Sequence, residues 1–514
     1  MILDYIILAL YALSMIAIAF YTKKRAGSVN DFLLAGKKGL NGWMTAFSYG
    51  TTYFSAVIFV GYAGQFGRAF GLASVWVGIG NAVIGTLIAW LVLAKRTKNM
   101  TRRLEAKTMP EFFEKRYGDK NIKYLTAVVI FVFLIPYSAS VYNGISSLFE
   151  VVLGIDGLVI MIALAALTAL YLFFGGYFAT ALSDFIQGII MLVGVACMVF
   201  CFMKHENINW DISRIVNDPD LTWFTFGGSN NKGLYGTTVS LLSLVLLTSL
   251  GVWALPQTIH KYYAIRDKKA ITQGVVVSTA FALIIGFSAY FTGALSAFFP
   301  ELASVSDSLV IPSMLKIAIP AGLTGIIAVL ILSASMSTLA SVSLASASVI
   351  AIDLYKGALN KNASDRKTNT VMRSLCLAFV ALSVTLAILN QKFGITAIAY
   401  MMGISWGTLA GCFMGPFVLG LLWKKVTRAA VWSSTIGSLV LTVALVIIFG
   451  YDKNGWSVSF ATALKDGVAT SPLIGVICMI ASVIITVAVS LVTQKPDDEI
   501  ICEAFHKSFE GEIK

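Results

Sequence analysis

Hydrophobic residues gather in thirteen long segments along the chain, and short polar stretches separate them. A helix needs roughly 20 apolar residues to cross the ~30 Å hydrocarbon core of a membrane, and each segment approaches or exceeds that length. The pattern predicts an all-α membrane protein with about thirteen transmembrane helices, near residues 2–21, 43–64, 71–94, 124–149, 157–175, 180–203, 236–256, 271–296, 321–352, 374–390, 394–423, 429–449 and 471–493.

Two of these segments carry residues that interrupt a helix. The second contains the run GTTYFS at 50–55, and the seventh contains Gly251 followed by Pro256. Helical hydrogen bonding can lapse at such places. The two segments lie five apart, so they are corresponding first helices if segments 2–6 and 7–11 are related repeats. That arrangement is typical of an inverted-repeat transporter with its binding site near the middle of the membrane.

The ninth segment contains a run of small and hydroxyl-bearing residues, SASMSTLASVSLASAS, at 333–348. Close helix packing in lipid explains such a run. A second explanation is a cation site, because Ala334, Ser337 and Thr338 at i, i+3 and i+4 place a carbonyl and two hydroxyls on one helix face. The pattern alone leaves both open. The end of the run, from Ser341 onward, is assigned to packing.

The composition agrees with a membrane protein, since 58% of the 514 residues are hydrophobic and 12% are charged. The formal net charge of +12 does not indicate nucleic acid, because 30 of the 38 Lys and Arg residues fall in alternate loops and the tail. Basic loops favour the cytoplasmic side. We expect a multi-pass protein of the cell membrane with its N-terminus outside and its C-terminus in the cytoplasm. Lys261, in the loop 261–269, is assigned to these basic anchors.

The sequence lacks the features of a membrane enzyme. The three histidines, His205, His260 and His506, are scattered, and no metal-ligand spacing or nucleophile motif accompanies them. The six cysteines show no paired spacing of a disulfide framework. The sequence therefore predicts no catalytic residue and no bound organic cofactor.

Six motifs, in order along the chain, resemble the sodium/solute symporter family, which includes bacterial proline, pantothenate, monocarboxylate, sialic acid and sugar symporters. The resemblance implies a leucine-transporter-type core of ten helices in two inverted repeats, with one extra helix before the core and two after it. The motifs are DFLLAGKKGL at 31–40, SYGTTYFSAVIFVGYAG at 48–64, KTMPEFFEKRYGD at 107–119, YLFFGGYFATALSDFIQG at 171–188, ALPQTIHKYYAIRDKKA at 254–270 and SASMSTLAS at 333–341.

On this chain the resemblance implies a single transporter domain over 1–514. Its parts are an extra N-terminal helix at 2–21, a first repeat at 43–203, a second repeat at 236–423, two C-terminal helices at 429–493 and a cytoplasmic tail at 494–514.

The resemblance also implies a sodium site between the broken first core helix and the eighth core helix. Carried onto this chain, its ligands are the carbonyl oxygens of Thr51, Phe54 and Ala334 and the hydroxyls of Ser337 and Thr338. Five neutral oxygens can replace much of the water shell of a sodium ion without holding it too tightly for release. Sodium is therefore the expected coupling ion.

Asp184 is the one carboxylate that lies inside a predicted span rather than near its end. A charge at that depth is costly and marks ion pathways in membrane proteins. The family pattern SDFIQ implies that Asp184 lies on the sodium exit path towards the cytoplasm without contacting the bound ion. The alternative is solvation at the inner surface, since the span begins near residue 180.

The substrate pocket of this fold lies beside the two broken helices, where aromatic faces can enclose a small solute and polar groups can orient it. Ile58 stands where sugar symporters have a polar sugar-binding side chain, which counts against a sugar. Tyr53 stands where proline symporters have an aspartate, which counts against proline. The expected substrate-binding residues are Tyr49, Tyr53, Tyr137, Trp253 and Gln257.

The leading interpretation is a secondary active symporter that imports a small organic solute by alternating access. An organic acid, a vitamin or an amino acid is favoured over a sugar. The inward sodium gradient supplies about 2.3 kcal/mol per charge per 100 mV. The alternatives are a transporter-like membrane sensor, whose signalling domain a partner protein would supply, and an uncoupled channel or facilitator. The expected partners are the solute, sodium and the lipid bilayer, while the oligomeric state is not predicted.

Overall fold

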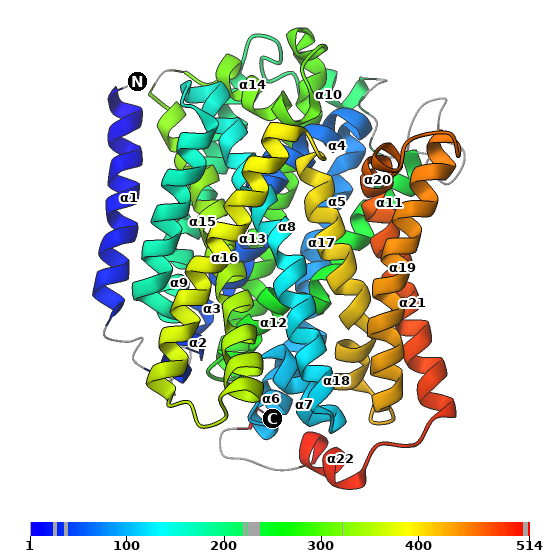
Figure 1. The fold of residues 1–514 in the computed structure, drawn as a ribbon. Helices are drawn as coiled ribbons and strands as arrows, with labels where there is room; N and C mark the ends of the chain where they lie inside the picture. The colour runs from blue at the N-terminus through cyan, green and yellow to red at the C-terminus, as the bar shows by residue number, and fades with distance from the viewer. Residues whose placement is uncertain are drawn as a thin grey trace.

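The protein is a bundle of long helices that run roughly along one direction (Figure 1). The N-terminal end of α1 (Ile2–Thr22) and α22 (Asp498–Phe505) lie at opposite ends of the bundle (Figure 1). Parts of the predicted loops at 22–42 and 204–235 and of the predicted tail lie outside the described residues. The computed structural model describes residues 2–23, 28–34, 40–218, 221, 223, 237–320, 322–506 and 512–513.

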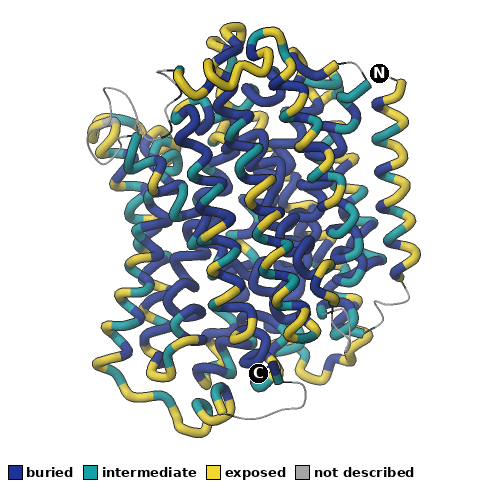
Figure 2. Tube along the Cα trace, turned by 180° about the vertical axis from the view of Figure 1, so that it is seen from behind, coloured by how far each residue is buried: buried dark blue, intermediate teal, exposed yellow. Residues whose placement is uncertain are grey.

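Eleven helices in this described part of the chain are long and apolar enough to cross a membrane. Their outer faces carry exposed large hydrophobic residues, among them Leu10, Val193 and Val440, as lipid contact requires. Figure 2 shows the buried residues in the middle of the bundle and the exposed ones on its periphery and at both ends. The predicted all-α membrane architecture is confirmed at this level.

The first predicted interruption is confirmed. Helix α3 (Gly42–Tyr53) stops at Phe54, whose backbone is extended with φ −102° and ψ 118°. Helical structure resumes after Ser55 and leads into α4 (Ala63–Phe70). The unwound turn frees carbonyl groups of α3 for contacts with other helices.

The chain reverses direction at Gly71, where φ is +55°. Gly42 and Trp90 both contact the beginning of α13 (Lys268–Ala294), whereas Gly67 contacts its last turn. The chain therefore runs along α13 in one direction before Gly71 and in the opposite direction after it.

Helix α9 (Gly157–Lys204) also contains a reversal, at Gly176 with φ +61°. The hydroxyls of Tyr171 and Ser183, twelve positions apart, form a hydrogen bond across it. In a straight helix these residues would be separated by about 18 Å, so the chain folds back here. Two of the eleven long helices thus each include parts of two predicted spans, and the count of thirteen crossings stays a prediction.

The second predicted interruption is confirmed as well. Helix α11 (Thr237–Leu250) continues into a tight turn at Gly251–Ala254, Leu255 is extended, and α12 (Pro256–Tyr263) follows. Proline at the first position of α12 has no N–H to leave unpaired. The end of α12 meets the start of α3, because the Leu40 N–H donates to the Ala264 carbonyl at 3.0 Å.

Helix α15 (Thr324–Ser348) is buried along nearly its whole length and packs against α1, α3, α8 and α9. Helical structure continues beyond it to Leu359, so Asp353, which the sequence pattern places at the start of a loop, lies on this helix. The remaining helices are α2 (Val29–Leu34), α5 (Val75–Ala82), α6 (Lys95–Arg103), α7 (Met109–Tyr117), α8 (Lys120–Leu153), α10 (Ile212–Asn217), α14 (Val310–Ala318), α16 (Asp365–Phe393), α17 (Ile398–Phe413), α18 (Gly420–Leu422), α19 (Arg428–Asn454), α20 (Phe460–Ala469) and α21 (Ser471–Val492).

Candidate functional site

The unwound end of α3 lies directly against the small-residue run of α15. The Ser337 hydroxyl donates to the carbonyl of Thr51 at 2.8 Å, and the Thr338 hydroxyl lies 3.2 Å from the carbonyls of both Thr52 and Ala334. All of these residues are buried. Four of the five predicted sodium ligands, including the carbonyls of Thr51 and Ala334, therefore meet in one place.

The fifth predicted ligand, Phe54, lies at the unwound point itself. Its side chain is buried and its ring packs against those of Tyr53, at 4.8 Å between centroids, and Phe281, at 6.3 Å. These contacts hold the Phe54 side chain in the core, while the role of its carbonyl stays a prediction.

The donor set fits a small hard cation. Hydroxyl hydrogens rotate freely, so the Ser337 and Thr338 oxygens can turn their lone pairs towards an ion that replaces the present hydrogen bonds. Neutral carbonyl and hydroxyl oxygens are ligands that such a cation accepts. The packing explanation for this part of α15 is compatible with this role, because the same side chains also join α3 to α15.

A cluster of charged and hydroxyl side chains lies next to these residues, one helical turn before Thr51 on α3 and one turn after Thr338 on α15. The ammonium of Lys261 donates to the Ser48 hydroxyl at 2.9 Å and to the Ser341 hydroxyl at 2.8 Å. Ser48 in turn donates to Asp184 at 2.5 Å, and the Thr52 and Ser341 hydroxyls are 2.9 Å apart. The nitrogen of Lys261 lies 3.5 Å from a carboxylate oxygen of Asp184. We call Lys261, Asp184, Ser48 and Ser341 the ammonium cage.

The ammonium cage corrects two expectations and rules out one alternative. The Lys261 side chain is 1% exposed and Asp184 is 0% exposed, so Lys261 is no cytoplasmic anchor and Asp184 is not solvated at the inner surface. Ser341 contacts an ammonium group, so packing alone does not describe it. A possible sequence signal for Lys261 was its place on the helical segment after Pro256, where the second broken span continues.

On the other side of α3, most polar groups of the predicted substrate residues already have partners. The Tyr49 hydroxyl donates to the Gly85 carbonyl at 2.8 Å, and the Trp253 indole N–H donates to the Ile84 carbonyl at 3.0 Å. The Tyr53 hydroxyl donates to the carbonyl of Thr248. The Tyr49 ring packs against Trp90 and Tyr262.

Tyr53 and Tyr137 meet at a residue that the sequence reasoning missed, Trp406 of α17. The Trp406 ring centroid lies 5.4 Å from that of Tyr137, edge to face, and 6.0 Å from that of Tyr53. The Tyr137 hydroxyl and the Trp406 indole N–H are buried and make no hydrogen bond of regular geometry. The Tyr137 hydroxyl faces the hydroxyls of Ser55 and Thr338. This aromatic cluster therefore places the Tyr137 hydroxyl beside the predicted sodium ligand Thr338, and it leaves the Trp406 N–H without a hydrogen-bond partner.

Gln257, the fifth predicted substrate residue, lies in the first turn of α12. Its side chain is buried and its carbonyl oxygen has no hydrogen-bond partner. The described structure thus gathers Tyr53 and Tyr137 at Trp406, and it places Tyr49 with Trp90 and Tyr262.

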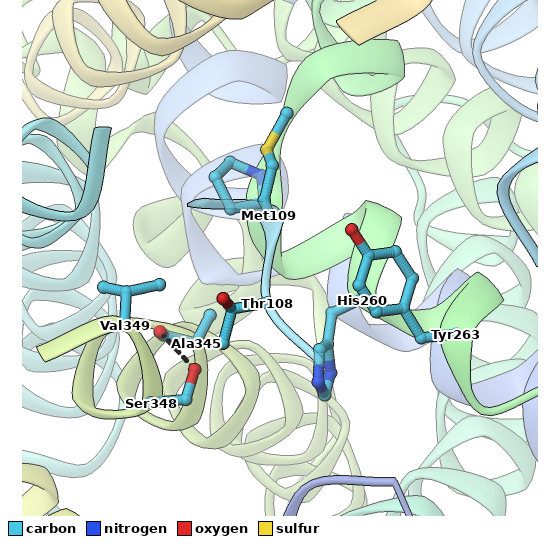
Figure 3. Close-up of a pocket in the computed structure, with 8 residues that line it drawn as sticks. Thr108, Met109, His260, Tyr263, Ala345, Ser348 and Val349 are labelled. Carbon is cyan, nitrogen blue, oxygen red and sulfur yellow. Dashed lines mark hydrogen bonds between the residues drawn. The ribbon is translucent and has the colours of Figure 1, made fainter. Parts of the chain in front are cut away.

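A narrow cavity of about 10 Å³, enough for about one water molecule, lies beyond the ammonium cage. In Figure 3, Thr108 lies between Ser348 on one side and His260 on the other. The Thr108 hydroxyl lies 2.9 and 3.0 Å from the two carboxylate oxygens of Asp353, which is buried. Asp353 is thus a second buried carboxylate, near the predicted sodium exit path. The sequence gives no signal for it, because the apolar span ends at residue 352 and Asp353 reads as the start of a loop.

The chain matches a known protein family and curated relatives over most of its length. The family model described as the sodium:solute symporter family covers residues 32–437. The osmoregulated proline transporter OpuE of Bacillus subtilis (strain 168) is 28% identical over 500 residues, which cover 95% of this chain and 94% of that relative. A sodium/proline symporter of Staphylococcus aureus is 27% identical over 511 residues, which cover 96% of this chain and 93% of that relative.

Two solved structures share the fold. A Na⁺-coupled sialic acid symporter in a substrate-bound, outward-open state has a TM-score of 0.77 and 18% sequence identity, over 96% of this chain and 98% of that one. A transporter of the nucleobase-cation-symport-1 family has a TM-score of 0.51 and 13% identity, over 95% of this chain and 97% of that one. At these identities the likeness concerns the fold.

Proposed function

The chain belongs to the sodium:solute symporter family and is a sodium-coupled symporter of a small organic solute, and we propose that it imports a small amino acid. Proline is the first substrate to test. The relatives named proline transporters support this choice, since they match 95% and 96% of this chain. Position 53 is a tyrosine where proline symporters have an aspartate, so the selectivity of the site between proline and other solutes has to be measured directly.

The aromatic cluster supports a substrate with a carboxylate. Tyr137 and Trp406 offer two buried donors that make no hydrogen bond of regular geometry, and a substrate carboxylate would accept from both, as charged acceptors form stronger hydrogen bonds than neutral ones. The rings of Tyr53, Tyr137 and Trp406 would cover the apolar part of the same molecule. Thr338 faces Tyr137, so a sodium ion bound there would also attract the carboxylate.

The proposed sodium site consists of the carbonyls of Thr51, Phe54 and Ala334 and the hydroxyls of Ser337 and Thr338. The observation that carries it is the 2.8 Å contact between the Ser337 hydroxyl and the Thr51 carbonyl. Since the ion would join α3 to α15, its binding and release would change how these two helices pack, which is what coupling to alternating access requires.

The proposed exit path for sodium runs from this site past Thr52 and Ser341, along the ammonium cage and through the narrow cavity beside His260. Asp184 lies on that path without contacting the bound ion, and its carboxylate offsets the Lys261 ammonium, which would otherwise repel the departing ion. The short contacts of Ser341 with both Thr52 and Lys261 support a continuous line of polar groups along α15.

The proposed architecture has thirteen crossings and a leucine-transporter-type core of two inverted repeats, at 43–203 and 236–423. The helix at 2–21 precedes the core, and two helices at 429–493 follow it. The reversals at Gly71 and Gly176 support the count, and the distribution of basic residues supports an outer N-terminus and a cytoplasmic C-terminus.

Uptake by proteoliposomes that contain the purified protein tests the proposed substrate. Labelled proline is supplied with an inward sodium gradient, and unlabelled small amino acids, monocarboxylates, pantothenate and sugars compete in turn. We expect proline uptake, and competition by small amino acids. If only compounds without an amino group compete for the transported substrate, the amino-acid assignment is wrong while sodium coupling stands.

A further inference from the structure

The ammonium of Lys261 occupies a position built from the ligands of a cation site. Two hydroxyl oxygens lie at 2.8 and 2.9 Å from its nitrogen, and an oxygen of Asp184 lies at 3.5 Å. The face of the Tyr177 ring covers the same nitrogen, with 5.2 Å to the centroid. Hydroxyls, a carboxylate and an aromatic face are each groups that attract a cation.

This cage lies next to the proposed sodium site and uses the same helices. Ser341 follows Thr338 by three residues on α15, and Ser48 precedes Thr51 by three residues on α3. The hydroxyl of Thr52, whose carbonyl lies 3.2 Å from the Thr338 hydroxyl, is also 2.9 Å from the Ser341 hydroxyl. Two cation positions one turn apart therefore share the interface of α3 and α15.

The second position differs from the first in its charge. The proposed sodium site has only neutral oxygens, whereas the ammonium cage contains the carboxylate of Asp184, which is fully buried. A buried carboxylate needs a compensating positive charge, because an unpaired charge is costly in the interior of a membrane protein. Lys261 supplies that charge from its own side chain, so no ion from solution is needed.

We propose that the Lys261 ammonium acts as a tethered cation in a second cation position, so that the symporter carries one sodium ion per substrate molecule. Removal of the ammonium would turn Asp184, Ser48 and Ser341 into a second sodium site. This inference rests on the proposed sodium site at Thr51 and Ser337. It goes beyond that site because it sets the ion stoichiometry.

The wild-type protein provides the first test. The fluxes of labelled sodium and labelled substrate into proteoliposomes are measured together, and the sodium dependence of uptake gives a Hill coefficient. We expect a flux ratio of one and a coefficient of one. A ratio of two in the wild type would overturn the tethered-cation proposal without affecting sodium coupling itself.

The variant Lys261→Met provides the second test. Methionine keeps an unbranched side chain without the charge, so sodium can enter beside Asp184, and we expect the flux ratio and the Hill coefficient to rise towards two. The double variant Lys261→Met/Asp184→Asn removes both charges, and we expect both values to return to one. If Lys261→Met transports with a ratio of one, the cage does not accept sodium and the proposal is wrong.

Lys123→Met is the matched control, because Lys123 is also buried and pairs with a carboxylate, that of Glu114, at 2.5 Å. We expect this variant to keep the wild-type flux ratio. If Lys261→Met yields no folded protein, the wild-type flux ratio still decides, because a ratio of two in the wild type overturns the proposal. Failure of the proposed sodium site would give a different result from failure of the tethered-cation proposal. In that case Ser337→Ala would leave the sodium dependence of uptake unchanged, and the flux ratio could still be measured.

Discussion

The hydroxyl of Ser337 donates a 2.8 Å hydrogen bond to the carbonyl of Thr51, a residue 286 positions earlier in the chain. The contact exists because α3 unwinds at Phe54 and because residue 337 lies in a run of small side chains that lets the two helices approach. It places the free carbonyls of one broken helix opposite the hydroxyls of a continuous one. The proposed sodium site follows from this contact.

Loss of either α15 hydroxyl should weaken sodium binding. We expect Ser337→Ala and Thr338→Ala each to raise the half-saturating sodium concentration of uptake by about tenfold or more, since a polar contact to a charged group is worth about 1.5–3 kcal/mol. Sodium titration of uptake measures the change. Ser343→Ala on the same helix is the control, because its buried hydroxyl has no partner, and it should titrate like the wild type. If Ser337→Ala and Thr338→Ala show the same half-saturating sodium concentration as Ser343→Ala, the assignment of the two hydroxyls to the sodium site is wrong.

Removal of the Asp184 charge alone should destabilise the protein. Asp184→Asn leaves the Lys261 ammonium buried without its carboxylate, and breaking a buried ion pair in this way costs about 3–5 kcal/mol. We expect a lower Tm in detergent for Asp184→Asn and a partial recovery in Asp184→Asn/Lys261→Met. Turnover of the folded fraction of Asp184→Asn should also be slower, with substrate affinity largely retained. A wild-type Tm and a wild-type turnover in the single variant would refute both roles of Asp184.

The Tyr137 hydroxyl and the Trp406 N–H of the aromatic cluster should set substrate affinity. We expect Tyr137→Phe and Trp406→Phe each to raise the substrate KM about tenfold or more, because each loses a hydrogen bond to a carboxylate. Initial rates of uptake at saturating sodium measure this. Tyr142→Phe, five residues further along α8, removes another buried tyrosine hydroxyl that makes no hydrogen bond of regular geometry and serves as the control. Unchanged KM values in both test variants would place the substrate elsewhere.

The orientation of the chain can be tested on its natural cysteines. Cys502 of α22 is exposed, whereas the others are buried or half-buried within the bundle. A membrane-impermeant maleimide should therefore label Cys502 only when the cytoplasmic side of vesicles is accessible, and Cys502→Ser should abolish that labelling. Labelling of Cys502 from the outside of sealed, right-side-out vesicles would reverse the proposed orientation.

Much of the fold follows from the sequence because its signals are local. Long apolar segments determine the membrane helices. Gly251 and Pro256 interrupt helical hydrogen bonding in the residues around them, which marks the break before α12. The sequence also separates the predicted spans between 64 and 71 and between 175 and 180, close to Gly71 and Gly176. That the chain reverses direction there becomes visible only through contacts such as that of Tyr171 with Ser183.

The site is only partly predictable for the same reason. Thr51, Ala334, Ser337 and Thr338 lie in motifs whose spacing indicates an ion site, and the structure brings them together. Lys261 stands close to a basic loop, so its sequence position indicates an anchor. Only the tertiary packing of α12 against α3 and α15, with its side-chain contact to α9, reveals its carboxylate and hydroxyl partners. Trp406 has no signal apart from being a large residue in a run of small ones.

The central claim is that sodium bound between α3 and α15 drives import. The most direct test compares the wild type with Ser337→Ala/Thr338→Ala in proteoliposomes loaded with the same buffer, with and without an inward sodium gradient, using a substrate that the wild type transports. We predict that the gradient stimulates uptake by the wild type and has little effect on the double variant. Equal stimulation of both proteins would contradict the account.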